Sequence, residues 1–283
     1  MPANPTLRVA AVQVDPQIGS KAENLAMVES KTREAAARGA TLVVFPECAL
    51  TGYGFGSRSE ALPLAEPVPG PSTDALARIC RELNVFVVVG MLELDGEKMF
   101  NAATLVGPDG VVGTYRKIHL PFLGVDRFVD PGDRHLAVLE ADGVKLGLHI
   151  CYDGSFPETA RVLTLLGADI LLLPTNWPVQ STSTAEHLPS TRAIENVVYV
   201  MAVDRVGTER GCSFAGRSSI VDPNGDILAK AGSVEPEILY ADIEPAKARQ
   251  KRLIRVPGEY ELDRIADRRP EFYSAITAPK ARP

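Results

Sequence analysis

Three residues that could cooperate in covalent catalysis stand where apolar segments of the chain end. Glu47 closes the run TLVVFPE, Lys117 closes VVGTYRK and Cys151 closes KLGLHIC. A cysteine can attack a carbonyl carbon, a glutamate can remove the thiol proton, and a lysine can stabilise negative charge. Each also has an ordinary interpretation, as a packed thiol, a solvated loop acid or a surface charge. Reactive groups gather at strand ends in α/β sheets, so the positions of these three residues are compatible with a common site. The positions alone do not establish that such a site exists.

Other chemistries find no support in the sequence. The chain contains no GxSxG elbow, no GxxxxGK[ST] phosphate loop and no HExxH metal motif. The segment 52–56, GYGFG, lacks the third glycine of a dinucleotide-binding loop and is interpreted as a flexible loop. The four histidines show no zinc-ligand spacing, so we expect no catalytic metal; they are His119, His135, His149 and His187.

Short apolar runs rich in Val, Ile and Leu predict the strands that position these residues. Most runs are continuous rather than alternating, which is typical of strands covered on both faces. Helical patterns over 21–38, 72–84 and 157–166 lie between them, the second capped by Ser72 or Thr73 and the third starting at Pro157. This alternation predicts an α/β fold. The apolar runs are 7–14, 41–45, 85–92, 145–151, 169–174 and 198–203.

The chain also repeats itself. EAAARGATLVVFPE is similar to RVLTLLGADILLLPT, CRELNVFVVVGM to AIENVVYVMAV, and GPDGVV to DPNGDI, in the same order. We therefore predict two related halves with sheet packed on sheet and helices outside, although α/β units commonly look alike. No linker interrupts the chain, so we expect a single domain over 1–283, with the charged segment 244–283 as a tail on the surface or on a partner subunit.

Composition limits the class of protein. The 283 residues are 45% apolar and 23% charged with a formal net charge of −6, close to an average soluble globular protein. That charge argues against a nucleic-acid partner, and no apolar run approaches the ~20 residues that span a membrane. The N-terminal sequence has no signal-peptide pattern and the four cysteines are scattered, so we expect free thiols and a cytoplasmic protein.

The contexts of the three candidate residues resemble one family. FPECALTGY, YRKIHLP and GLHICYDGSFPE occur in an order and at spacings similar to those of the nitrilase, or carbon–nitrogen hydrolase, superfamily, and the resemblance extends from AVQVDPQIGSKAENL to DRRPEFY. It implies a four-layer α-β-β-α sandwich, in agreement with the two halves. It also implies that Cys151 is a nucleophile forming a thioester, Glu47 the general base, and Lys117 with the backbone N–H of Tyr152 the oxyanion donors, without a cofactor. We expect the helix beginning at Pro157 to lower the pKa of Cys151.

The resemblance is incomplete after the lysine. Family members often carry a second Glu there, whereas KIHLPFLGVDRFVDPGD has none, so Asp126 is either its replacement or an ordinary loop acid. Trp177 is interpreted as a wall of the substrate pocket or a core aromatic, and Tyr53 as a further pocket residue. Cys48 should point away from Glu47 if the chain is extended there. His119 and His149 are interpreted as structural. Arg192, Glu195 and Asn196 either form a buried polar network near the site or cap and pair on a helix, and we favour the second interpretation.

The resemblance favours an amidase that hydrolyses a small carboxamide to carboxylate and ammonia. Cys151-Tyr152-Asp153 is similar to amidase branches, and Ser155 stands where branches acting on ω-amides of dicarboxylic acids tend to carry Arg. We therefore expect uncharged acyl groups, with Arg127 or another loop residue as the alternative source of that charge. A nitrilase, an N-carbamoyl-amine hydrolase and a silent scaffold of the same fold are the alternatives. The family also implies a homodimer or higher homo-oligomer through the helix after Pro157 and the C-terminal tail.

Overall fold

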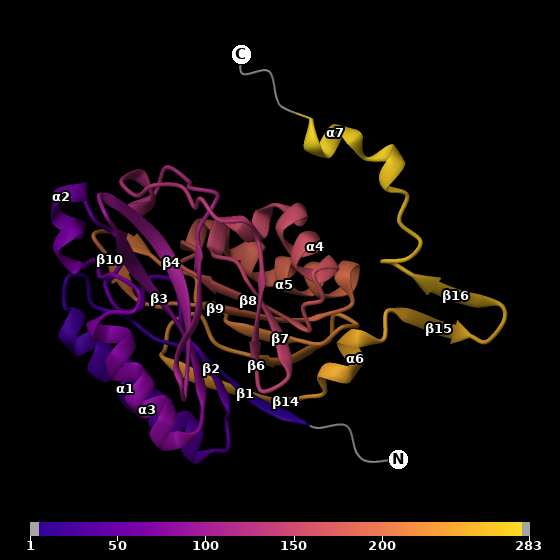
Figure 1. The fold of residues 1–283 in the computed structure, drawn as a ribbon, viewed down its shortest axis with the longest axis horizontal. Coiled ribbons are helices and arrows are strands. Elements are labelled where there is room, and N and C mark those ends of the chain that lie inside the picture. The colour runs from indigo at the N-terminus through magenta and orange to yellow at the C-terminus, as the bar shows by residue number, and fades with distance from the viewer. Residues whose placement is uncertain (1–5, 279–283) are drawn as a thin grey trace.

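Two six-stranded mixed sheets form the body of the molecule, which the computed structural model describes over residues 6–278 (Figure 1). The first sheet has the order β14-β1-β2-β3-β4-β5 and the second β6-β7-β8-β9-β12-β13. Read in these directions, both show the same succession of pairings: antiparallel, parallel, parallel, antiparallel, antiparallel. The two sheets therefore share one design, as the internal repeat predicts.

The six predicted apolar runs coincide with strands to within a few residues at each end, and the two sheets contain six further strands that those runs do not cover. Those of the first sheet are β1 (Leu7–Gln13), β2 (Leu42–Val44), β3 (Phe86–Asp95), β4 (Lys98–Gly107), β5 (Gly110–Arg116) and β14 (Glu237–Ile243). Those of the second are β6 (Val138–Ala141), β7 (Val144–Leu148), β8 (Ile170–Thr175), β9 (Tyr199–Asp204), β12 (Ser219–Val221) and β13 (Ile227–Lys230). Two small ladders pair β10 (Thr208–Glu209) with β11 (Cys212–Ser213), and β15 (Arg252–Val256) with β16 (Tyr260–Asp263).

The two sheets pack face to face through an apolar core. Val44 and Val88 of the first sheet belong to the same buried cluster as Leu148 and Leu172 of the second. The outer faces are covered by helices, so strands such as β2, β8 and β9 are buried along their whole length. That double cover explains the continuous rather than alternating runs, and it confirms the four-layer sandwich.

Two pairs of helices form the outer layers. Buried residues of α1 (Lys21–Ala37) and α3 (Pro71–Leu83) pack on the first sheet, and those of α4 (Pro157–Leu165) and α5 (Thr182–Asn196) pack on the second. The predicted cap of α3 is wrong. The helix begins one residue before Ser72, and Thr73 lies inside it, where its hydroxyl accepts a bond from the Gly70 N–H. Pro71 therefore takes the first helical position, where its fixed φ is favourable.

The C-terminal segment leaves the sandwich. After α6 (Pro245–Arg249), the β15–β16 hairpin and α7 (Ser274–Thr277) extend away from the sheets, in the yellow part of Figure 1. Large apolar side chains are exposed there: Phe272 is 70% and Ile276 59% accessible. Elsewhere α2 (Arg58–Ala61) and short 3₁₀ turns, including 124–127 and 151–155, connect the elements. Within residues 6–278, each helix is too short or too polar to cross a lipid bilayer.

Candidate active site

Glu47 lies in a turn directly after β2. The backbone of Cys48 has φ +50, so the chain turns there, and the extended geometry expected for this residue is wrong. The turn packs against β3 at Gly90, where an added Cβ would stand 2.3 Å from the Cys48 nitrogen and 2.4 Å from the Pro46 oxygen. Only glycine permits such an approach. The turn buries the Glu47 carboxylate completely.

Lys117 joins Glu47 in a buried polar cluster. Its Nζ lies 2.6 Å from Glu47 Oε1 and 2.5 Å from Asp126 Oδ2, and all three side chains are inaccessible. Asn101 of β4 lies across from Lys117, accepting the Lys117 N–H at its carbonyl, and its Nδ2 donates to Glu47 Oε1 at 2.7 Å and to Asp126 Oδ1 at 2.8 Å. The Tyr53 hydroxyl donates to Asp126 Oδ2 at 2.8 Å. The structure thus brings four of the predicted site residues together and adds Asn101.

One ammonium serves two carboxylates in this cluster. Burial raises the pKa of Glu47, and the Lys117 charge opposes that rise. Burial alone would lower the pKa of Lys117, but Glu47 and Asp126 raise it well above its ordinary value, so it stays charged. A carboxylate with a raised pKa is a stronger base than an exposed one. The Glu47 oxygen Oε2 has no hydrogen-bond partner among residues 6–278, so it is free to take a proton.

Cys151 enters the same region from the second sheet. It follows β7, opens the 151–155 turn with φ +45, and is 6% accessible. Burial and the Glu47 charge raise the pKa of this thiol, while Lys117 lowers it. The lowering expected from the helix that begins at Pro157 does not prevail, because desolvation outweighs it. The thiol is therefore neutral at rest and needs a base to become a nucleophile.

Unsatisfied polar atoms surround the thiol. Both side-chain polar atoms of Asn176, directly after β8, are buried and have no partner within the described part of the chain, and the buried Thr175 hydroxyl has its contact with the Cys151 thiol. Both residues also act on the pKa of Cys151, which places them beside it. Buried polar groups without partners are rare in folded proteins. Together with Glu47 Oε2 they can form hydrogen bonds to a small polar molecule at the thiol.

The remaining predicted residues occupy different surroundings. Trp177 is 4% accessible and shares a buried cluster with Cys151, while its backbone N–H donates to Asp204 Oδ1 at 2.9 Å. The Tyr152 side chain is 40% accessible and meets the Phe156 ring edge-on. Trp177 therefore belongs to the same buried core as Cys151, and the role predicted for Tyr152 concerns its backbone alone.

Two interactions were not anticipated from the sequence. Asn101 stands in the apolar stretch MFNAATLV of β4, and a polar residue inside a fully buried strand is the signal that could have indicated it. Arg192 of α5 does pair with Glu195 at 3.0 Å, but its Nε and Nη2 also reach the Gly154 carbonyl at 3.1 and 3.0 Å. It therefore fixes the turn that carries Cys151.

Comparisons with known proteins agree with this geometry. Residues 8–253 match the family model described as carbon-nitrogen hydrolase. The chain belongs to the carbon–nitrogen hydrolase family. The hydrolase is 40% identical over 268 residues to a nitrilase from Pyrococcus abyssi, covering 94% of this chain and 99% of the relative. It is 34% identical over 261 residues to an omega-amidase from Homo sapiens, covering 87% and 92%.

Solved structures show the same fold with an active-site cysteine. An amidase from Nesterenkonia sp. superposes on the hydrolase with a TM-score of 0.79 at 26% identity, covering 95% of this chain and 96% of the amidase. A variant of that amidase, with a TM-score of 0.78 at 26% identity over 97% and 98% of the two chains, carries the acetamide moiety of fluoroacetamide covalently added at its active-site cysteine. The predicted superfamily and the enzyme class, a carbon–nitrogen hydrolase, are confirmed.

The described residues offer no ready-made metal centre. Among residues 6–278, no three His, Cys, Asp or Glu side chains are grouped so that they could hold an ion. The polar cluster instead contains its own cation, the Lys117 ammonium, placed between two carboxylates. What the arrangement can supply is therefore a base, a fixed positive charge and a thiol.

Proposed function

We propose that the hydrolase is an amidase that converts a small carboxamide to a carboxylate and ammonia through a thioester on Cys151. Glu47 removes the thiol proton as sulfur attacks the carbonyl carbon, and Lys117 and the Tyr152 N–H stabilise the oxyanion. The proton on Glu47 then passes to the departing ammonia. Glu47 next takes a proton from water as the water oxygen attacks the thioester carbon, and it returns this proton to the sulfur when the C–S bond breaks, which restores the thiol.

The observation that carries this proposal is the electrostatic state of the thiol and its neighbour. Burial keeps Cys151 protonated, and the carboxylate that faces it has a raised pKa and a free oxygen. Such a pair needs proton transfer to react, which the general-base mechanism provides. Lys117 is bonded on one side to Glu47 and on the other to Asp126, so Asp126 serves to hold the ammonium in place.

The substrate is proposed to carry an uncharged acyl group. A cavity of about 240 Å³ beside Tyr53 is lined by Phe122, Phe214, Arg127 and Glu209, among others. Two of its three charged groups are held in ion pairs, Glu209 with Arg205 and Arg210 with Glu60. The Arg127 guanidinium donates to two carbonyls, and Glu209 accepts from Arg205 at 2.7 Å. Arg127 has no carboxylate partner among the described residues, so it is the one cation of this lining that a substrate carboxylate could meet, and the proposal of an uncharged acyl group is supported by Ser155 standing where an arginine is expected for ω-amides.

Ammonia release from a panel of substrates tests the proposal. We expect propionamide and benzamide to exceed succinamate and propionitrile in kcat/KM, and Cys151→Ala to abolish turnover. Cys80→Ala is the matched control, because Cys80 is a buried thiol in the core between α3 and the first sheet. A preference for succinamate would favour the omega-amidase relatives, and a preference for the nitrile would favour the nitrilase relative. Full activity of Cys151→Ala would reject the mechanism.

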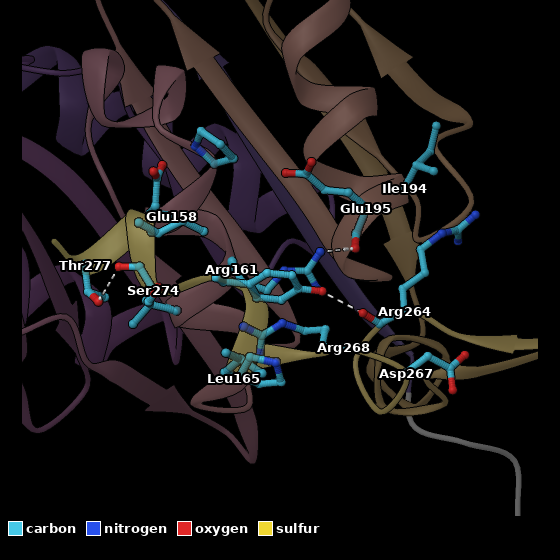
Figure 2. A pocket seen from close by; sticks show the side chains of 15 residues that line it. Glu158, Arg161, Leu165, Ile194, Glu195, Arg264, Asp267, Arg268, Ser274 and Thr277 are labelled. Carbon is cyan, nitrogen blue, oxygen red and sulfur yellow. Dashed lines mark hydrogen bonds between the residues drawn. The ribbon is translucent and has the colours of Figure 1, made fainter.

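We also propose that the protein self-associates through the outer face of α4. A groove of about 990 Å³ runs between α4, α5 and the C-terminal segment (Figure 2). Exposed apolar side chains line it, including Val162, Leu165, Ile194 and Ile276. Arg161 spans the groove, donating to the Glu195 and Arg264 carbonyls. A second copy of the chain, presenting the same face, would bury this surface by two-fold symmetry.

The chemistry also favours a reducing compartment, which we propose to be the cytoplasm. The four cysteines of the chain are free in the structure. A nucleophilic thiol is lost on oxidation, so a protein that depends on Cys151 benefits from surroundings that keep thiols reduced.

A further inference from the structure

Asp153 connects the segment that carries Lys117 to the turn that carries Cys151. Its Oδ2 accepts the Tyr115 hydroxyl at 2.7 Å and the Ile150 N–H at 2.9 Å. Its Oδ1 lies 2.8 Å from His119 Nδ1 and accepts the His119 backbone N–H at 3.0 Å. A carboxylate has about four acceptor positions, so this side chain is fully occupied.

The partners of Asp153 are placed with respect to the reacting groups. Tyr115 and His119 stand two residues before and two residues after Lys117, while Ile150 directly precedes Cys151. In an extended segment, residues two apart share a face, so one carboxylate can reach both neighbours of the lysine. Asp153 itself is 0% accessible.

We propose that Asp153 is a positioning residue, and that the Tyr115–Asp153–His119 clamp fixes the placement of the Lys117 ammonium relative to the Cys151 thiol. This inference rests on the proposed function. Within residues 6–278 the Asp153 carboxylate makes no hydrogen bond to the thiol or to Glu47, so it acts through its partners. The clamp joins the two sheets at the point where the base and cation of the first face the nucleophile of the second.

Further contacts hold the clamp rigid. The His119 ring stacks on Phe156 with centroids 3.7 Å apart and planes 10° apart, directly before α4. From the other side, Arg192 holds the carbonyl of Gly154, the residue after Asp153. Burial and the Asp153 charge raise the pKa of Tyr115, so its hydroxyl remains a donor. Because the 151–155 turn is held from both sides, any displacement of Tyr115 or His119 also displaces the Cys151 thiol.

The substitution Asp153→Asn tests this assignment. The amide presents N–H groups to two of the four donors, so Lys117 and Cys151 lose their fixed spacing. We expect kcat to fall roughly 100-fold with KM changed by less than about threefold, because a misplacement near 1 Å has that effect on a catalytic group. In the absence of substrate, iodoacetamide should alkylate Cys151 more slowly and with a higher pH midpoint, since Lys117 lowers the pKa of this thiol.

Asp169→Asn is the matched control. Asp169 is also a buried aspartate of the second half, accepting from the Lys145 N–H and twice from Arg249, but it stands before β8, at the opposite end of the strand from Thr175. The Asp169→Asn variant should be less stable than the wild type but have the same kcat. If Asp153→Asn behaves like this control, losing stability while kcat and the pH midpoint of alkylation stay unchanged, the clamp is not a positioning device and the proposal is overturned.

Tyr115→Phe keeps the test open if Asp153→Asn does not fold. It removes one of four donors, so we expect about a tenfold loss in kcat and a smaller shift of the alkylation midpoint. Unchanged values for both would overturn the proposal. If the wild-type protein hydrolyses no amide, the proposed function fails, whereas alkylation of Cys151 still tests whether the clamp positions Lys117.

Discussion

Replacing Lys117 by methionine should make the stability of the protein depend on pH. The substitution keeps the length of the side chain and removes the cation between Glu47 and Asp126, both of which are fully buried. Breaking a buried ion pair costs about 3–5 kcal/mol, because an uncompensated charge remains inside the protein. We expect the free energy of unfolding to fall by that amount at pH 8.

Protonation of the carboxylates limits the loss at lower pH. Burial already raises the pKa of Glu47 in the wild type, and removing Lys117 raises it further. The folded variant then binds more protons than the unfolded chain, so its stability decreases as pH rises above the ordinary carboxyl pKa. Neutralising one carboxyl costs about 1.4 kcal/mol per pH unit above that pKa. Near pH 5 the penalty should therefore shrink to about 1–2 kcal/mol.

Urea unfolding of the wild type and Lys117→Met at pH 5 and pH 8, at one protein concentration, measures both values. Adding Glu47→Gln to the variant removes one of the unpaired charges and should restore most of the stability at pH 8. An equal loss at both pH values, or no recovery with the second substitution, would show that the cluster is not organised by the lysine charge.

Three further predictions concern catalysis, packing and assembly. Glu47→Gln and Lys117→Ala should each remove most activity and the double variant little more, whereas steady-state losses that multiply would mean independent action. Gly90→Ala should cost about 1–3 kcal/mol in thermal or urea unfolding and reduce kcat, because its Cβ meets the turn that carries Glu47. Gly232→Ala, where a Cβ meets nothing within 4 Å, is its control, and equal effects would contradict the argument. Light scattering should give a mass above the single-chain 30.4 kDa for the wild type and for Val234→Glu, the control outside the groove, and the single-chain mass for Leu165→Glu. A single-chain mass for the wild type would exclude the dimer.

The layers of the fold could be predicted because their signal is distributed over many residues. Continuous apolar runs and a repeated order of elements depend on no single position, and both sheets agree with them. Local details of the fold depend on a few atoms and are harder to predict from the sequence. The sequence predicts a cap for α3 at Ser72 or Thr73, but proline is favoured at the first helical position, so the helix begins at Pro71.

The residues of the site could be predicted where sequence motifs identify them. Properties that depend on burial, such as a pKa, could not. Glu47, Lys117 and Asp126 come together, as their positions suggested, but the expected fall in the pKa of Cys151 is reversed by desolvation, which no local sequence pattern reports. The extended conformation expected at Cys48 failed because a positive φ there depends on close packing against Gly90, a residue distant in sequence. Contacts such as Arg192 with Gly154 arise only from packing of α5 on the turn.

The division of the polar groups between two sheets has a consequence for how the reaction rate can be tuned. Glu47 and Lys117 are attached to one sheet and Cys151 to the other, so their separation depends on how the two sheets pack on each other. The apolar residues between the layers, Val88 and Leu172 among them, fill the space that sets this packing, although they carry no reactive group. Substitutions that change side-chain volume there should change the distance between the base and the thiol, and with it kcat. The interior of the sandwich is therefore a place where substitutions can adjust turnover without altering a reacting group.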